Sequence, residues 1–179
     1  KTIKEDINIS HIPVILLTAR DDRQSQISGY KNGADGYLSK PFEVEMLMEL
    51  IRNRLKNREY TKKRYLNAGL IPTPEESTIS LTDETFLIKL NSIIQENIEN
   101  SNLGIQFICQ EVGLGRSSLY NKLKALTGMG ANEYISKLRI EKAITLISGT
   151  DMPFSEIAEK TGFTTPSYFS TAFKQYTGE

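Results

Sequence analysis

Residues 12–18 form a continuous apolar run, and the stretch that follows is mostly polar. A short apolar run of this kind is typical of a strand buried on both faces of a sheet. Residues 21–31 open with two aspartates and are followed by Asn32-Gly33, which are common signals for the start and end of a helix. The pattern therefore predicts a strand at 12–18 and a polar-faced helix at 21–31.

The same alternation recurs between residues 36 and 56. Residues 36–39 form a second, shorter strand candidate, which ends before Lys40-Pro41-Phe42. From Phe42 to about Lys56 apolar residues recur at helical spacing. Strand, helix, strand and helix separated by tight glycine or proline breaks predict part of a parallel α/β sheet in residues 1–57.

Residues 58–78 separate this region from the rest of the chain. Their first part is charged and their second part is broken by Pro72 and Pro74, which predicts a linker. Beyond it the strand pattern ends. Thr82, with Asp83 and Glu84 in the first turn, opens a helix. The apolar face of this helix consists of Phe86, Leu87, Leu90, Ile93, Ile94 and Ile98. We expect a domain boundary near residue 78 and an all-helical domain over 79–179.

One pattern occurs twice in the helical half, at about 104–126 and 153–176. In each copy a small residue, Cys109 or Ala158, stands four positions before a glycine. The small residue allows a close helix crossing, and glycine adopts the left-handed conformation that a tight turn requires. An apolar residue follows each glycine, and the next helix presents a core pair at positions i and i+4. These pairs are Leu119 with Leu123 and Phe169 with Phe173.

The two copies lie 49 residues apart and are joined by one amphipathic helix, expected at Asn132–Ser148. Any small helical bundle contains such turns, so one copy alone would be weak support for a special motif. Two copies at this separation predict two helix-turn-helix motifs in tandem. In the second copy, Thr165-Pro166 has the residue types of an N-cap followed by a first-turn proline.

Residues 80–179 resemble the AraC/XylS family of bacterial regulators. The motifs that carry the resemblance are LYNKLKALTG at 119–128, IA at 157–158, GF at 162–163, SYF at 167–169 and FK at 173–174. The resemblance implies that the second helix of each motif enters the major groove of double-stranded DNA. The residues expected to face DNA lie opposite the core pairs: Arg116, Ser117, Tyr120, Asn121, Lys124, Ser167, Ser170, Thr171 and Lys174.

These residues differ in what they can contribute. Arg116 and Asn121 carry the donors and acceptors that recognise a guanine or adenine edge, whereas hydroxyls and lysines more often hold phosphate. Tyr120 is ambiguous, because core packing is the more common role for a tyrosine at such a position. Pro166 lies at the N-terminal end of the second helix that is expected to enter the major groove.

The charge balance does not by itself indicate a nucleic-acid partner. The chain has 22 basic and 22 acidic residues, and from Ile79 onward 9 basic residues stand against 11 acidic ones. A domain-wide basic field is therefore absent. Two local groups of basic residues are expected to supply phosphate contacts instead. They are Arg116, Lys122 and Lys124, and Lys137, Arg139 and Lys142 on the following helix.

Residues 9–57 resemble the C-terminal part of a response-regulator receiver domain, which has a flavodoxin-like fold. The resemblance rests on IPVILLTA at 12–19, GADGY at 33–37 and KPF at 40–42. It implies that Thr18, Tyr37 and Lys40 are the switch residues, with Thr18 and Lys40 on adjacent strand ends and a cis proline after the lysine. A lysine and a hydroxyl offer donors to a phosphoryl group, and the aromatic ring moves in behind the hydroxyl.

The same resemblance places the phosphoacceptor aspartate and the magnesium-binding acids on strands that would precede Lys1. Asp21, Asp22 and Asp35 lie in loops or helices and do not replace them. We therefore expect no cofactor here; Mg²⁺ is expected only with the missing strands. With His11 and Cys109 the only histidine and cysteine, a zinc site, a disulfide within the chain and hydrolase chemistry are not expected.

The sequence thus predicts a mainly α chain: an incomplete α/β receiver fragment at 1–57, a linker at 58–78 and an AraC-type DNA-binding domain at 79–179. The expected function is sequence-specific transcription regulation, as the output part of a two-component phosphorelay protein. The alternative is a phosphorelay or helical protein-interaction module without DNA contact. We expect no enzymatic activity in this segment.

The start at Lys1 indicates a piece of a longer protein, either a hybrid sensor kinase or a separate response regulator. The segment itself has no apolar run of membrane-spanning length and is expected in the cytoplasm. Because neighbouring strands of the sheet are missing, residues 1–57 are expected either to self-associate through the edge of strand 12–18 or to be loosely ordered.

Overall fold

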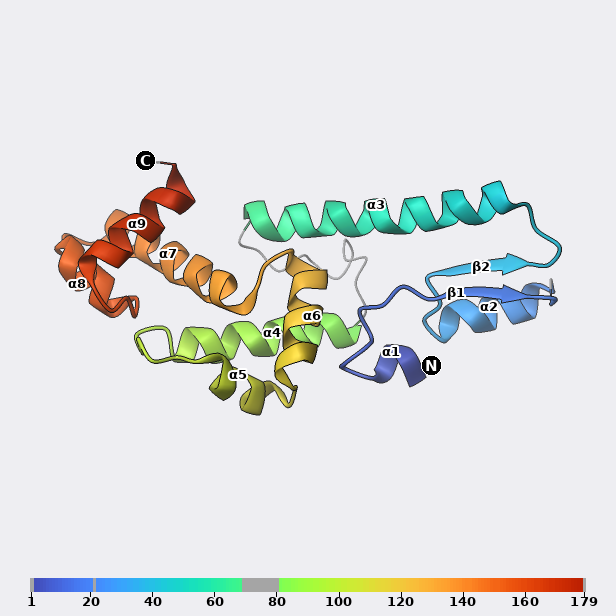
Figure 1. The fold of residues 1–179 in the computed structure, drawn as a ribbon, viewed down its shortest axis with the longest axis horizontal. Coiled ribbons are helices and arrows are strands. Elements are labelled where there is room, and N and C mark those ends of the chain that lie inside the picture. Colours follow the sequence, from blue (N-terminus) through green and yellow to red (C-terminus); the bar gives the residue numbers. More distant parts are fainter. Residues whose placement is uncertain (1, 21, 69–80, 179) are drawn as a thin grey trace. The chain divides into compact units, whose positions relative to one another are not determined.

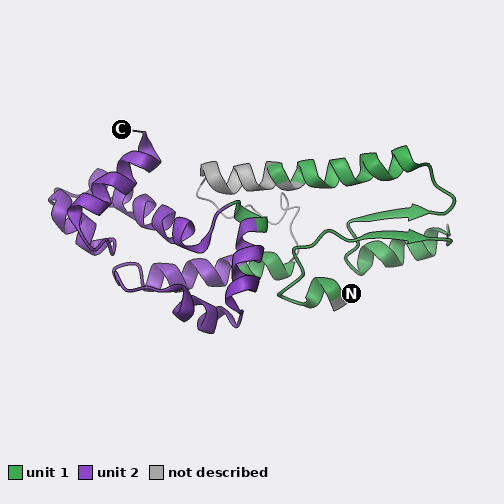
Figure 2. Cartoon of the chain, in the orientation of Figure 1, with its two compact units in different colours: residues 1–86, 125–128 green, residues 87–124, 129–179 purple. Residues whose placement is uncertain are grey.

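The computed structural model describes residues 2–20, 22–68 and 81–178. The chain divides into two compact units, residues 1–86 with 125–128 and residues 87–124 with 129–179 (Figure 2). The described residues form mostly helices and one short sheet (Figure 1). The predicted fold class, mainly α with two parallel strands, is confirmed.

The sheet of the first unit contains two parallel strands, β1 (Ile15–Thr18) and β2 (Gly36–Ser39). The helix α2 (Arg23–Lys31) connects them; Asp22 caps it by accepting a hydrogen bond from Ser25 N. The predicted helix and second strand are confirmed. β1 begins three residues later than predicted, because Val14 N donates to the Asp35 side chain at 2.7 Å and not to a strand neighbour.

The expectation that β1 is buried on both faces is wrong for this chain. Leu16 and Leu17 on β1 remain 37% and 43% exposed, whereas Leu38 on β2 is buried. Within the described residues the sheet ends at β1, so one edge of this strand lacks a ladder partner. An apolar run alone predicts a strand but not whether other elements cover it.

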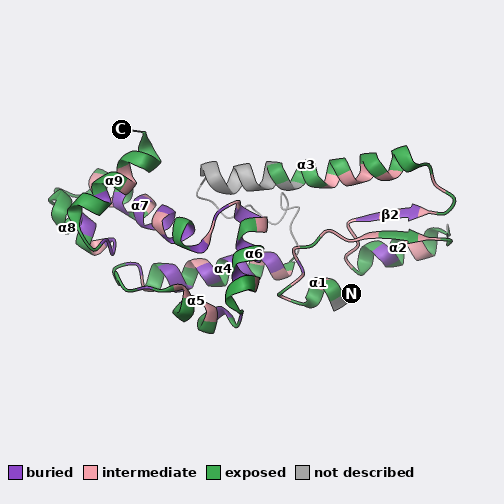
Figure 3. Ribbon diagram, in the orientation of Figure 1, coloured by how far each residue is buried: buried purple, intermediate pink, exposed green. Residues whose placement is uncertain are grey.

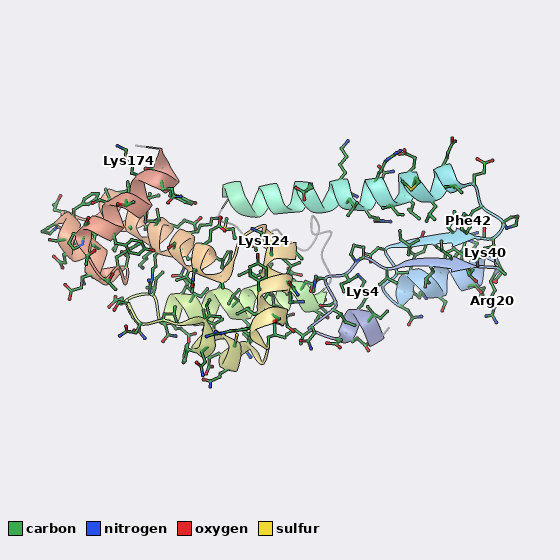
Figure 4. All side chains as sticks on the ribbon, in the orientation of Figure 1. Lys4, Arg20, Lys40, Phe42, Lys124 and Lys174 are labelled. Atoms are coloured by element: carbon green, nitrogen blue, oxygen red, sulfur yellow. The ribbon has the colours of Figure 1, made fainter. Side chains whose placement is uncertain are left out.

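A short helix that the sequence did not predict, α1 (Thr2–Glu5), precedes the sheet. From it, Lys4 Nζ donates to the carbonyl oxygen of Ile12 at 2.9 Å and pairs with Asp35 at 2.7 Å. Lys4 therefore fastens α1 to the segments before both strands (Figure 4). Asp35 has a structural role as the partner of this lysine and of Val14 N.

The N-terminal segment also contacts the beginning of α4 (Leu81–Glu96) within the first unit. Ser10 Oγ donates to Asp83 Oδ1 at 2.7 Å, and both residues are buried. Thr82 Oγ1 donates to the Lys4 carbonyl oxygen at 3.0 Å. Asp83 thus joins two segments distant in sequence, in addition to lying in the first turn of its helix.

The helix α3 (Val44–Ala68) is longer than predicted, because it continues well beyond Lys56 into the segment expected to be a linker. Residues 57–68 contain neither proline nor glycine, so no residue in this stretch breaks the helix. The remainder of the predicted linker and the predicted boundary near residue 78 fall in 69–80, outside the described residues.

The second unit contains the two predicted motifs in tandem. The first pairs α5 (Ile105–Val112) with α6 (Arg116–Thr127), and the second pairs α8 (Phe154–Lys160) with α9 (Pro166–Thr177). The joining helix, α7 (Ala131–Gly149), matches the predicted 132–148 within one residue at each end. Tyr134 on α7 donates to Asn91 Oδ1 on α4 at 2.8 Å, and burial raises the pKa of this tyrosine to about 12.

Apolar burial holds each motif together (Figure 3). In the second motif, Phe169 is fully buried and its ring lies 5.1–5.6 Å from those of Phe154, Phe163 and Phe173. In the first motif, Leu119 and Leu123 are each 1% exposed. Both predicted core pairs therefore face inward, although Phe173 is only partly buried.

Both turns contain the expected left-handed glycine. Gly113 has φ 74° and Gly162 has φ 72°, and the residues after them, Leu114 and Phe163, are each 5% exposed. The two glycines differ in their surroundings. A Cβ added to Gly113 would meet nothing within 4 Å, whereas one added to Gly162 would lie 2.2 Å from the Ile98 carbonyl oxygen.

This difference predicts unequal effects of the same substitution. Gly113→Ala should lower the free energy of unfolding by about 1–2 kcal/mol, which is the penalty of a left-handed conformation for an L-residue. Gly162→Ala should cost about 1–3 kcal/mol more, because the methyl group also displaces the Ile98 backbone. Urea unfolding followed by helical circular dichroism measures both values; equal costs would contradict the close approach at Gly162.

Candidate nucleic-acid interface

The outer face of α6 carries the first group of predicted DNA-facing residues. Leu119 and Leu123 occupy the buried side, so side chains on the other side of the helix point to solvent. The exposed residues there are Arg116, Ser117, Tyr120, Asn121 and Lys124. The structure therefore brings all five together on one helix face.

Tyr120 is 53% exposed. The core role that the sequence favoured for it is wrong, and its ring belongs to the outer face of α6. A groove of about 770 Å³ runs between α6 and the start of α7. It is lined by Arg116, Ser117, Tyr120 and Asn121 from α6 and by residues 130–133.

The outer face of α9 carries the second group. Ser167, Ser170, Thr171 and Lys174 are exposed opposite the buried Phe169. Thr165 caps the helix by accepting a hydrogen bond from Tyr168 N, and Pro166 occupies the first turn, as predicted.

The hydroxyl groups of α9 have local partners. Ser170 Oγ donates to the Pro166 carbonyl oxygen at 3.0 Å, and Thr171 Oγ1 donates to that of Ser167 at 3.1 Å. Each hydroxyl oxygen can accept a further hydrogen bond in this arrangement. To donate to a phosphate, the hydroxyl would have to rotate away from its own helix.

A second groove, of about 440 Å³, lies between α7 and α9. Thr171 lines it together with residues from the first part of α7. Asn132 and Glu133 line both grooves, so the two grooves meet at the start of α7. At the far end of α9, Tyr176 donates to Glu141 Oε1 at 3.1 Å, and burial together with this carboxylate raises the pKa of Tyr176 to about 12.

The two predicted basic groups do not both form surface charge. Arg116, Lys124 and Lys142 are exposed, but Lys122, Lys137 and Arg139 are 0%, 5% and 9% exposed. The prediction that these last three contact phosphate is wrong, because they lie on the inward faces of their helices. Lys122 follows Leu119 by three positions and so shares its buried side. Lys137 lies 3.5 Å from Glu141.

The predicted switch residues of the first unit lie together at one end of the sheet. Lys40 N donates to the Thr18 carbonyl oxygen at 2.6 Å, and the Lys40–Pro41 peptide bond is cis, as the resemblance implies. Figure 4 shows Arg20, Lys40 and Phe42 at this end. Thr18 Oγ1 accepts a hydrogen bond from Arg20 N, and Tyr37 donates its hydroxyl hydrogen to the Arg20 carbonyl oxygen.

Arg20 also belongs to this site, which the sequence did not predict. Through its backbone it joins the hydroxyl of Thr18 to that of Tyr37. The Lys40 side chain is exposed. Backbone contacts of this kind depend on the loop conformation and leave no signal in the residue type.

Two aspartates of this unit have structural partners. Asp22 accepts hydrogen bonds from Ser25, which lower the pKa of its carboxyl group, and Asp35 pairs with Lys4. Within the described residues no three histidine, cysteine, aspartate or glutamate side chains gather as they would around a metal ion. In the same residues, no helix is both long and apolar enough to cross a bilayer.

Comparison with known proteins places these elements in a family. A family model described as a helix-turn-helix domain matches residues 108–179. Over 173 residues, 97% of its length, the chain is 41% identical to Histidine kinase P4 of Formosa agariphila. Over 95 residues, 53% of its length, it is 33% identical to the HTH-type transcriptional activator RhaR of Salmonella dublin. The chain covers 13% and 33% of these two proteins, so it corresponds to a small part of each.

Among solved structures, a transcriptional regulator from Chromobacterium violaceum of the AraC-type DNA-binding domain-containing proteins is similar over 54% of this chain and 85% of that one. The TM-score is 0.50 and the sequence identity 25%. The family match, the tandem motifs and this likeness agree with one another. Residues 108–179 therefore form a helix-turn-helix domain of the AraC type, a DNA-binding domain of transcription regulators.

Proposed function

We propose that this domain binds double-stranded DNA in a sequence-specific manner, with α6 and α9 each in a major groove, and thereby controls transcription. The observation that carries the proposal is the exposure of all nine predicted DNA-facing residues on these two helices. The two grooves that meet at Asn132 and Glu133 support it, since one is lined by the outer face of α6 and the other by Thr171 of α9.

The two helices offer different chemistry to DNA. Arg116 and Asn121 on α6 are exposed and can form paired hydrogen bonds with guanine and adenine edges. The hydroxyls of α9 already donate within their helix, so they suit acceptance of hydrogen bonds or weak phosphate contacts. We infer that α6 supplies more of the direct base recognition than α9.

Electrostatics sets the strength of non-specific binding. With Lys122, Lys137 and Arg139 buried, few exposed basic residues remain near the two helices, among them Arg116, Lys124 and Lys174. Each phosphate contact contributes roughly one unit to the slope of log affinity against log salt concentration. We expect a shallow salt dependence and a modest affinity for random DNA.

Replacing Asn121 by Ala should lower specific affinity by about 1–3 kcal/mol and relax the preference at one base position. The measurement is binding to DNA selected from a random pool, repeated with single base substitutions. Ser101→Ala, an exposed residue outside the helices, serves as the control. Unchanged affinity and preference in the Asn121 variant would show that α6 does not recognise bases.

Lys124→Ala should instead weaken binding to all DNA sequences alike. It should also reduce the slope of log affinity against log salt concentration by about one unit. If no DNA of any sequence bound the wild-type chain in a salt-dependent way, the alternative of a helical protein-interaction module would replace the DNA-binding proposal.

We also propose that residues 1–57 are the C-terminal part of a receiver and that the protein is the output end of a two-component phosphorelay. The contacts among Thr18, Arg20, Tyr37 and Lys40 support a switch at this end of the sheet. The likeness of 97% of the chain to 13% of the length of a histidine kinase supports a hybrid sensor parent. In this proposal the segment has no catalytic role, works in the cytoplasm and holds no cofactor; Mg²⁺ would bind only with receiver strands outside it.

Lys40→Ala in the full-length protein should uncouple the upstream signal from transcription, because the lysine would no longer contact the phosphoryl group. Reporter expression with and without the signal measures this, and the DNA affinity of the 179-residue chain should stay at the wild-type value. Lys31→Ala, an exposed lysine at the end of α2, is the matched control. Normal signal dependence in the Lys40 variant would contradict the switch.

We propose, finally, that β1 mediates self-association. Leu16 and Leu17 are exposed on a strand whose outer edge has no ladder partner among the described residues. Gel filtration with light scattering should show a dimer or larger species for the 179-residue chain. Leu17→Lys should shift it towards the monomer, and Ile88→Lys, at a residue 49% exposed on α4, should not. A wild-type monomer at all concentrations would contradict this proposal.

A further inference from the structure

Arg139 lies near the middle of α7, the helix that joins the two motifs, and is only 9% exposed. Its Nη2 donates to the Asn100 carbonyl oxygen at 2.7 Å. Asn100 belongs to the connection between α4 and α5, which leads into the first motif. The guanidinium group therefore fastens the joining helix to the entrance of the first motif.

The same guanidinium contacts the turn of the second motif. Its Cζ lies 6.0 Å from the centroid of the Phe163 ring, the buried residue that follows the turn glycine. A Cβ on Gly162 would lie 2.9 Å from Nη2 and 2.2 Å from the Ile98 carbonyl oxygen. The turn of the second motif thus lies directly against both Arg139 and the backbone that precedes the first motif.

The chemistry of arginine suits this position. A planar guanidinium can donate to a carbonyl oxygen and lie over an aromatic ring at the same time, which a lysine ammonium group does less well. Burial lowers the pKa of Arg139, and its buried Nε has no hydrogen-bond partner among the described residues. A buried charge with an unsatisfied N–H contributes less to stability than a well-packed apolar side chain would.

The other contacts between the motifs do not supply the same constraint. The second motif packs on α7 through an apolar cluster that includes Ile140, Ala143, Ile157 and Phe169, and such contacts are not directional. Tyr134 and Asn91 join α7 to α4 but do not involve the second motif. Tyr176 and Glu141 join α9 to α7 but do not involve the first motif. The guanidinium of Arg139 makes directional contacts on both sides, with Asn100 at the entrance of the first motif and with Phe163 of the second.

We infer that Arg139 is a positioning residue that holds α6 and α9 at one separation and angle, and that it thereby restricts the spacing between the two DNA elements the domain accepts. This inference rests on the proposed function. Arg139 itself is buried and touches no DNA, so it acts only through the placement of the two motifs.

The separation of the motifs can be measured without DNA. Glu111→Cys on α5 and Glu159→Cys on α8, both at exposed positions, would carry spin labels in a Cys109→Ala background of the 179-residue chain. Pulsed electron spin resonance should give one narrow distance distribution for the parent. Arg139→Met should broaden or split that distribution, and Arg139→Lys should give an intermediate result.

Two controls separate positioning from general destabilisation. Lys142→Met, at an exposed position of the same helix, should leave the distribution narrow. Helical circular dichroism should show that the Arg139 variants remain folded; if Arg139→Met unfolds, Arg139→Lys carries the test. A distribution as narrow as the parent's in a folded Arg139 variant would overturn the inference.

The DNA measurement uses a duplex selected by the wild-type chain from a random pool, with one base pair inserted or removed between its two recognised elements. Wild-type affinity should fall about tenfold or more with the changed spacing, and the Arg139→Met affinities for the two duplexes should differ by less than about threefold. Equal discrimination by both proteins would also overturn the inference. If the wild-type chain selected no DNA, the proposed function would fail, and the distance measurement would still decide the role of Arg139.

Discussion

The arrangement of the helical unit depends on a backbone contact at Gly162. The left-handed conformation at this residue turns the chain between α8 and α9, and the absent side chain lets the Ile98 carbonyl oxygen approach to within 2.2 Å of the position a Cβ would occupy. No other residue type allows both. Because the second motif can approach so closely, Arg139 reaches Asn100 on one side and Phe163 on the other.

Gly113 supplies the same turn in the first motif without the close approach. The two equivalent glycines therefore differ in role. Gly113 only turns the chain, whereas Gly162 also allows the close approach of the backbone that precedes the first motif. The same inequality extends to the helices that follow them. The α6 face combines Arg116 and Asn121 beside an open groove, whereas the α9 face is rich in hydroxyls that donate within the helix.

Part of the basic charge of this domain is buried. Lys122, Lys137 and Arg139 lie in the interior, where Glu141 pairs with Lys137 and a carbonyl oxygen receives Arg139. Of the basic groups left at the surface, Lys124 and Lys174 lie in the C-terminal halves of α6 and α9 (Figure 4), and Lys142 lies on α7. In a domain with more acidic than basic residues, specific contacts from a few placed side chains must then supply most of the affinity for a DNA site.

The sequence by itself determined the features that local chemistry dictates. Glycine at 113 and 162, the Thr165-Pro166 start and the spacing of Leu119 with Leu123 and of Phe169 with Phe173 predicted both motifs, because turns, caps and helix faces depend on near neighbours. The tertiary structure decided that Lys137 and Arg139 are buried, that Asp83 bonds Ser10 and that Arg139 bonds Asn100. Those outcomes depend on contacts between segments distant in sequence, whereas the burial of Lys122 follows already from its spacing of three residues from Leu119.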